Sequence, residues 1–153
     1  MIELEPGISA PPFVFPVELG KVKEFATATG SSHPDYFATD TPVVPPTFLI
    51  SGLMFWGYTL DYPRDSAFAR VDLDRSMLLH AEEEFEFPGE PPIAGQKLTA
   101  QSRISEVTRK QGRRGGDLLF VVTETEFRDL SGRLVARNRN TVVKTEKPAG
   151  DSQ

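Results

Sequence analysis

The chain has 153 residues, a length that suits one domain. Hydrophobic residues make up 39% and charged residues 25%, as in ordinary globular proteins, and 17 Lys and Arg residues against 22 Asp and Glu residues give a net charge of −5. This acidic balance argues against a nucleic-acid-binding protein, and the absence of cysteine excludes disulfides, thiol nucleophiles, iron–sulfur clusters and cysteine-bound zinc.

The N-terminal region predicts no secretory signal, because residues 1–7 are acidic and no apolar run follows them. The most apolar stretch, residues 48–60, is shorter than the roughly 20 residues that a bilayer span requires. The sequence therefore predicts a cytoplasmic protein.

Two helices are predicted in the first half of the chain. Residues 17–28 place apolar side chains on one face and end at Gly30, a residue that favours a helix end. After a proline-rich extended segment, a second helix begins at Pro46 or Thr47 and continues to Leu60. Its apolar residues fall on every face, which predicts a helix enclosed by the rest of the fold.

The second half predicts four strands, at residues 79–87, 97–104, 118–127 and 134–144. In the first of them, four apolar residues on an inward face alternate with four polar residues on a charged outer face: Leu79, Ala81, Phe85 and Phe87 with His80, Glu82, Glu84 and Glu86. Residues 109–116 form a basic, glycine-rich hairpin, and the apolar-free residues 146–153 predict a disordered tail after one domain over residues 1–145.

Helices followed by strands predict an α+β protein in which a helix packs on one side of an antiparallel sheet. A helix that is apolar all round is best enclosed by a single curled sheet. Such a sheet leaves open edges, so a partner chain is expected.

Several segments, in their order and spacing, resemble a known family. They are the helix end Ala28-Thr29-Gly30, the turn His33-Pro34-Asp35-Tyr36-Phe37, the segment Pro45-Pro46-Thr47-Phe48, the strand from Leu79 to Phe87 and the run Gly112-Arg113-Arg114-Gly115-Gly116. Together they resemble the MaoC-like hotdog dehydratases, in particular the FAS1-like dehydratase N-terminal type, over residues 11–145.

The resemblance implies a hotdog fold, in which a curved antiparallel sheet wraps a long central helix and two units pair edge to edge. It also implies a hydro-lyase of fatty acid metabolism that adds water to 2,3-enoyl thioesters or removes it from 3-hydroxyacyl thioesters. The substrate would be a thioester of coenzyme A or of acyl carrier protein, and neither a cofactor nor a metal is expected.

In hydratase-competent relatives, an Asp and a His in a Gly-Asp-x-Asn-Pro-x-His pattern transfer the protons. On this chain Gly30 and Pro34 match the pattern, but the Asp position is Ser31 and the His position is Tyr36. A serine is no carboxylate base, and a tyrosine with a pKa of about 10 is a poor base at neutral pH. Both dyad positions are therefore lost.

Other residues are candidates for the missing chemistry. His33, Asp35 and Tyr36 share one turn and could act in catalysis, although a solvated turn with local backbone caps is the alternative. His80 could line the thioester pocket or meet a partner, or could make an ordinary polar contact within the sheet beside Glu82.

Further residues are candidates for substrate binding. The basic hairpin could bind the phosphates of coenzyme A or an acidic carrier protein through Arg109, Arg113 and Arg114. The alternative is a solvated hairpin tip with no ligand. Apolar residues of the enclosed helix could line an acyl tunnel, or serve only as core: Phe48, Phe55 and Trp56.

The favoured hypothesis is a non-catalytic hotdog half that shapes the acyl pocket beside a catalytic MaoC-like subunit. A self-sufficient homodimeric acyl-CoA hydratase or thioesterase that uses His33 and Asp35 is the first alternative. An acyl-thioester-binding protein without a reaction is the second. Fold alone does not decide among them.

Overall fold

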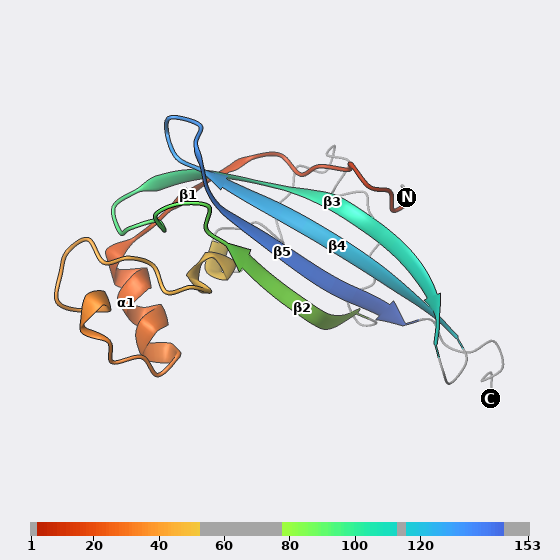
Figure 1. Ribbon diagram of the computed structural model, residues 1–153, viewed down its shortest axis with the longest axis horizontal. Coiled ribbons are helices and arrows are strands. Elements are labelled where there is room, and N and C mark those ends of the chain that lie inside the picture. The colour runs from red at the N-terminus through yellow and green to blue at the C-terminus, as the bar shows by residue number, and fades with distance from the viewer. Residues whose placement is uncertain (1–2, 53–77, 113–115, 146–153) are drawn as a thin grey trace.

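The computed structural model describes residues 3–52, 78–112 and 116–145. Its elements, in chain order, are strand β1 (Phe13–Pro16), helix α1 (Leu19–Ala28), the short 3-10 turns η1 (Pro34–Tyr36) and η2 (Phe48–Ile50), and strands β2 (Leu78–Glu86), β3 (Lys97–Gln111), β4 (Asp117–Arg128) and β5 (Leu134–Thr145). Figure 1 shows a long, curved sheet with α1 and η2 gathered at one end.

The strands form one antiparallel sheet in the order β1-β3-β4-β5-β2. The strands β3, β4 and β5 follow one another as long hairpins, whereas β2 crosses to the far side and pairs with β5 (Figure 1). The four predicted strands are confirmed, but β3 continues to Gln111 and not only to residue 104, because its pairing with β4 continues that far. Residues 109–111 therefore belong to a strand, and the prediction that they form part of the hairpin connection is wrong. The extended segment before α1 forms a fifth, because Phe15 pairs with Leu98 at the edge of β3.

One edge of the sheet is covered by the N-terminal segment. Beyond β1, the N–H of Gly7 donates to the carbonyl of Ile104 and the N–H of Ala10 donates to the carbonyl of Ser102, each at 2.8 Å. Leu4 and Ile8 from this segment also pack on a small apolar cluster around Ile104. The opposite edge is β2, which pairs on one side only within the part of the chain that the structure describes.

Helix α1 begins two residues later than the sequence predicts. Val17 belongs to the sheet end, because its N–H donates to the carbonyl of Gln96 and its carbonyl accepts from the N–H of Gly95, each at 2.8 Å. The buried face of the helix is formed by Val22 and Ala26. No helix among the described residues has the length and apolar character of a membrane span.

Aromatic rings join the helical end to the sheet. The ring of Phe15, which is fully buried, lies 6.0 Å from that of Phe48 and 5.8 Å from that of Phe127, measured between centroids. Phe48 also meets Phe25 of α1 edge-on at 5.6 Å. The core therefore includes β1, β4, α1 and the segment that precedes the predicted enclosed helix.

The described part of the predicted enclosed helix is its beginning. After η2, Ser51 and Gly52 take helical conformation and are buried. A Cβ atom on Gly52 would lie 2.9 Å from two ring carbons of Phe15, so only glycine lets the helix start this close to β1. The remainder of that helix and the predicted disordered tail lie outside the described residues.

We predict that Gly52→Ala destabilises the protein by about 1–3 kcal/mol, because the fully buried Phe15 ring has no room to move away. Urea unfolding would measure the change. Gly20→Ala in α1 is the matched control: a Cβ there meets nothing within 4 Å, so this change should be neutral or stabilising. Equal stability of the two variants would contradict the close-packing argument.

Candidate functional site

The turn after α1 carries the positions that the sequence resemblance matches to the proton-transfer dyad. Gly30 has a positive φ of 75°, and the N–H of Ser31 donates to the carbonyl of Ala26 at 2.9 Å, so the helix ends in a glycine cap. The Ser31 hydroxyl accepts a hydrogen bond from the N–H of His33 at 3.3 Å. Where the hydratase pattern has a carboxylate, this chain has a hydroxyl that holds the turn together.

His33, Asp35 and Tyr36 lie together on this turn. His33 caps η1: its Nδ1 accepts from the N–H of Asp35 at 3.4 Å and lies 3.5 Å from the Asp35 carboxylate. Its ring is 6.1 Å from that of Tyr36. The His33 and Asp35 side chains are 62% and 68% exposed, so water competes for their contact. The geometry is that of a capped turn, and a catalytic role for these residues stays a prediction.

A small cavity lies between α1 and the start of the enclosed helix. It has a volume of about 220 Å³, and its lining residues are Lys21, Glu24, Phe25, Ala28, Phe48 and Ser51. Phe48, which the sequence proposes as a substrate-binding residue, forms one wall although it is only 1% exposed. Phe25 meets it edge-on, so an apolar group would find aromatic carbon on two sides of this cavity.

The strand β2 departs from the predicted alternation. A bulge between His80 and Glu82 changes the register with β5, so that His80 lies opposite Val142 and Glu83 lies opposite Asn140. Opposite residues of an antiparallel pair share a face, which puts His80 on the same face as Glu83 and not on the face of Glu82. The placement of His80 beside Glu82 is therefore wrong, and Leu79, predicted to face inward, is 60% exposed.

The bulge assembles a polar cluster on the core-facing side of the sheet. Nε2 of His80 lies 2.7 Å from a carboxylate oxygen of Glu83, and the side-chain amides of Asn138 and Asn140 both donate to the same carboxylate. The Glu83 side chain is only 13% exposed and Asn138 is 2% exposed. Sequence reasoning missed this cluster. The run Glu82-Glu83-Glu84 gave a signal, since three consecutive strand residues cannot all face outward.

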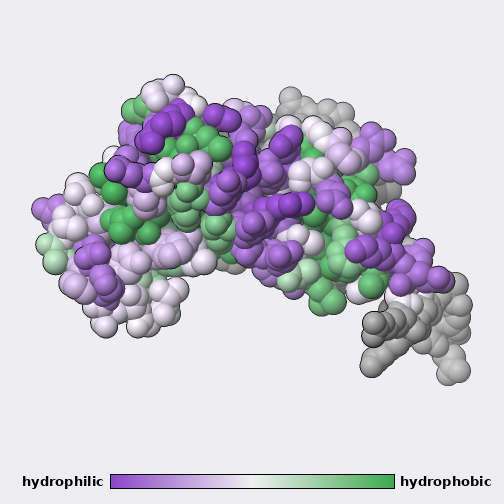
Figure 2. All heavy atoms as spheres, viewed as in Figure 1, coloured by the Kyte–Doolittle hydropathy of each residue, from purple (hydrophilic) through white to green (hydrophobic). Residues whose placement is uncertain are grey.

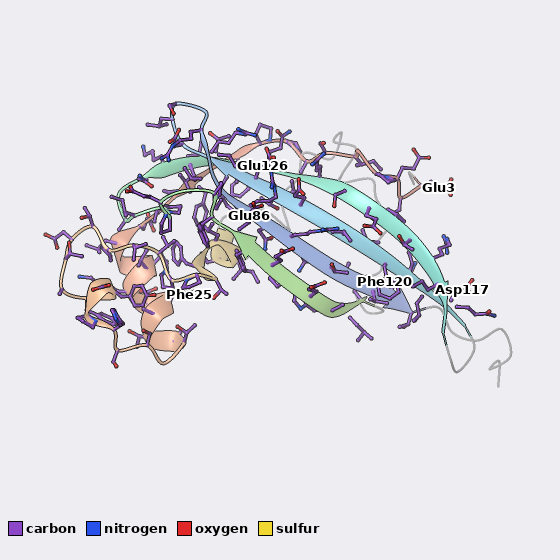
Figure 3. All side chains as sticks on the ribbon, in the orientation of Figure 1. Glu3, Phe25, Glu86, Asp117, Phe120 and Glu126 are labelled. Atoms are coloured by element: carbon purple, nitrogen blue, oxygen red, sulfur yellow. The ribbon has the colours of Figure 1, made fainter. Side chains whose placement is uncertain are left out.

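The outer face of the sheet carries a network of ion pairs. Arg103 contacts Glu124 at 2.6 Å, and Arg128 contacts Glu126 at 2.6 Å. The hydrogen bond from Arg128 lowers the pKa of Glu126, and the hydrogen bond to Glu124 raises the pKa of Arg103. Figure 3 labels Glu126 near the C-terminal end of β4, and Figure 2 shows hydrophilic side chains gathered over the sheet.

Arg109, the other candidate among the described residues, is not brought together with the turn. Arg109 is exposed near the far end of β3, and the neighbouring Lys110 lies over the ring of Phe120 at 4.9 Å. Four further candidates, Phe55, Trp56, Arg113 and Arg114, lie outside the described residues. Among the described residues, no three His, Asp or Glu side chains gather in a way that could hold a metal ion.

Solved structures with this architecture define the class of protein. The chain is similar to the HadBC (3R-hydroxyacyl-ACP dehydratase) complex of Mycobacterium tuberculosis, with a TM-score of 0.64 and 25% identity over 92% of this chain and 99% of that one. It is also similar in fold to the ChsH1–ChsH2 complex of the same organism, with a TM-score of 0.70 and 18% identity over 94% and 86% of the two chains. The fold is a hotdog fold of the MaoC-like type.

The family follows from the sequence comparison. Residues 6–138 match the family described as FAS1-like, dehydratase domain region, and the chain belongs to this family. It is 30% identical over 117 residues to the UPF0336 protein SCO4636 of Streptomyces coelicolor, covering 69% of this chain and 73% of that one. It is 32% identical over 102 residues to the Drosophila melanogaster peroxisomal multifunctional enzyme type 2, covering 67% of this chain and 16% of the enzyme. The description of the matched family places the chain among dehydratase domains.

We predict that Glu83→Ala destabilises the protein by about 1–3 kcal/mol, because it leaves the amides of Asn138 and Asn140 without their acceptor on the core-facing side. Chemical denaturation would measure the loss. Glu84→Ala is the matched control, since this neighbour faces outward and is exposed. A Glu83→Ala variant as stable as the Glu84→Ala variant would contradict the role of the cluster.

Proposed function

We propose that this chain is the non-catalytic half of an enoyl-thioester hydratase or 3-hydroxyacyl-thioester dehydratase. In the hydration direction, the oxygen of water bonds to C3 of the enoyl thioester and a proton is added at C2. One group must take a proton from water and one must give a proton to C2, while hydrogen-bond donors stabilise the enolate oxygen of the thioester. Under this proposal, a MaoC-like partner supplies the proton-transfer groups.

The observation that carries the proposal is the identity of the two dyad positions. Ser31 uses its hydroxyl to accept from the N–H of His33, and Tyr36 ends a short 3-10 turn. A serine hydroxyl and a phenol lack the carboxylate and the imidazole that commonly serve as general bases. Yet the chain keeps the fold of the dehydratases and belongs to their family. A retained fold with a lost dyad fits a chain that works inside a complex.

The cavity beside Phe48 supports a role in shaping the acyl pocket. It lies next to the turn that carries the dyad positions, since Ala28 lines it and the cap residues follow directly. Its aromatic walls suit a hydrocarbon chain, and Lys21 and Glu24, which also line it and contact each other at 3.0 Å, suit the polar end of a substrate. The name of the HadBC complex, a dehydratase of 3-hydroxyacyl-ACP, supports the same class of substrate here.

A self-sufficient enzyme is the second candidate, because Nδ1 of His33 lies 3.5 Å from the Asp35 carboxylate. A carboxylate beside an imidazole is a common acid–base arrangement. The exposure of both side chains disfavours it, because catalytic pairs act best where water is excluded.

We predict that the purified chain alone does not hydrate crotonyl-CoA above the protein-free rate, and that co-purification with a MaoC-like subunit carrying the intact Gly-Asp-x-Asn-Pro-x-His pattern restores turnover. The loss of absorbance of the enoyl thioester would measure the reaction. In this complex, His33→Ala should leave kcat within about twofold of the wild type. Turnover by the lone chain that His33→Ala abolishes would instead establish the self-sufficient enzyme.

We also predict that Ala28→Trp, which fills the cavity from α1, lowers kcat/KM for a long-chain enoyl thioester by about tenfold or more in the complex. The same variant should leave crotonyl-CoA turnover nearly unchanged, because a four-carbon chain does not need the extra volume. Thr27→Trp is the control, since Thr27 is exposed and does not line the cavity. An equal loss for both chain lengths would contradict the acyl-pocket role.

A further inference from the structure

The two edges of the sheet differ in what they offer to a second chain. The β3 edge is covered by β1 and by the hydrogen bonds from Gly7 and Ala10. The β2 edge pairs with β5 on one side and with no other described strand. An open edge presents backbone N–H and C=O groups in a row, so a further strand can be added there. In Figure 1, β2 forms the lower border of the sheet along its length.

The outward face of this edge is a row of carboxylates. Glu82, Glu84 and Glu86 are all exposed and share the outer face. Glu86 contacts Arg137 at 2.8 Å. Arg139, which lies opposite Glu84 on β5, contacts Glu106 at 3.5 Å. Within the described residues, Glu82 and Glu84 therefore have no cation paired with them, and Figure 3 shows the end of the row at Glu86.

The same edge also has an apolar end. Leu79 is 60% exposed, and the bulge turns it to the outer face, where it lies opposite Val143. Val143 is in turn opposite Phe120 on β4. A strand added to β2 would thus meet an apolar contact at Leu79 and a negative row from Glu82 onward. Charged side chains are one of the devices by which natural edge strands avoid pairing, whereas this edge also offers an exposed apolar side chain for contact.

A second copy of this chain is a poor partner for this edge. Residues that lie opposite each other in an antiparallel pair share a face, so symmetric pairing of β2 with β2 brings outward residues against outward residues. Consider two copies that pair symmetrically through residues 82–86, with outward residues opposite outward residues. In every such register at least one Glu lies opposite a Glu of the other copy, for example Glu82 opposite Glu84 of the second copy. Like charges in this position weaken pairing.

We infer that the β2 edge selects against a second copy of this chain and in favour of a different chain, whose edge strand carries Lys or Arg at the outward positions opposite Glu82 and Glu84. This inference rests on the proposed function, in which the chain works beside another subunit, and it specifies which edge that subunit uses and what charge it carries. The acidic row sets the identity of the partner, and Leu79 adds apolar contact.

The experiment uses the chain itself as the probe. A Glu82→Lys/Glu84→Lys variant supplies an edge of opposite charge, and sedimentation velocity follows its association with the wild type at low and high salt. The mixture should form a heterodimer roughly 3- to 30-fold tighter than the wild-type homodimer, with the advantage lost at high salt. Amide hydrogen exchange at residues 82–86 should slow in the mixture, which locates the contact at β2.

Two variants with Gln in place of Glu distinguish the effect of the charge at this edge from the effect of the net charge of the chain. Glu82→Gln/Glu84→Gln should strengthen self-association, whereas Glu5→Gln/Glu90→Gln, which removes two charges from exposed positions elsewhere, should not. Circular dichroism would verify that all variants are folded. Absence of association in the mixture, or equal self-association of the two Gln variants, would overturn the inference. Neither result involves hydratase activity, so failure here is distinct from failure of the proposed function.

Discussion

The contact between Gly52 and the Phe15 ring is the constraint on which the helical end of the molecule depends. It allows the enclosed helix to start against β1, where a Cβ atom would lie 2.9 Å from the ring. Phe15 in turn packs on Phe48 and Phe127, so one residue of an edge strand joins the sheet to the helix start. The cavity beside α1 opens between these same elements, because Phe48 and Ser51 form its inner wall. The geometry of the candidate acyl pocket therefore follows from how closely the helix approaches the sheet.

The strands were predictable because apolar and polar residues alternate along the sequence of a strand that has one buried face. This alternation is clear in β3, where Leu98 and Ala100 are buried between exposed neighbours. The alternation gave a wrong prediction in β2, because a bulge inserts one residue there. The residues before the bulge therefore lie on the opposite faces from those that the alternation predicts. Nothing in the sequence fixes the position of a bulge. The place of β1 in the sheet was missed for another reason. The sequence shows these four residues only as an extended segment before α1, and their pairing with β3 depends on residues far away in the chain.

The candidate site also has some features that the sequence predicts and others that depend on the folded structure. The loss of the dyad is predicted from Ser31 and Tyr36 alone, because it concerns residue identity at matched positions, and it stays a prediction. The state of His33 could not, since its exposure and its cap on Asp35 depend on the folded turn. The Glu83 cluster depends on the bulge and on two asparagines about 55 residues away in the chain. The run Glu82-Glu83-Glu84 indicates that one carboxylate faces inward, but the residues that bind it are set by tertiary contacts that the local pattern does not contain.

We propose that this chain keeps the dehydratase fold without the groups that move protons. The most direct measurement is deuterium incorporation at C2 of a thioester in D2O, which detects proton transfer even where net hydration is slow. The account predicts that the lone chain leaves 3-hydroxybutyryl-CoA and crotonyl-CoA without deuterium at C2 beyond the protein-free level, by mass spectrometry. Incorporation by the lone chain well above that level, lost in a His33→Ala or Tyr36→Phe variant, would contradict it.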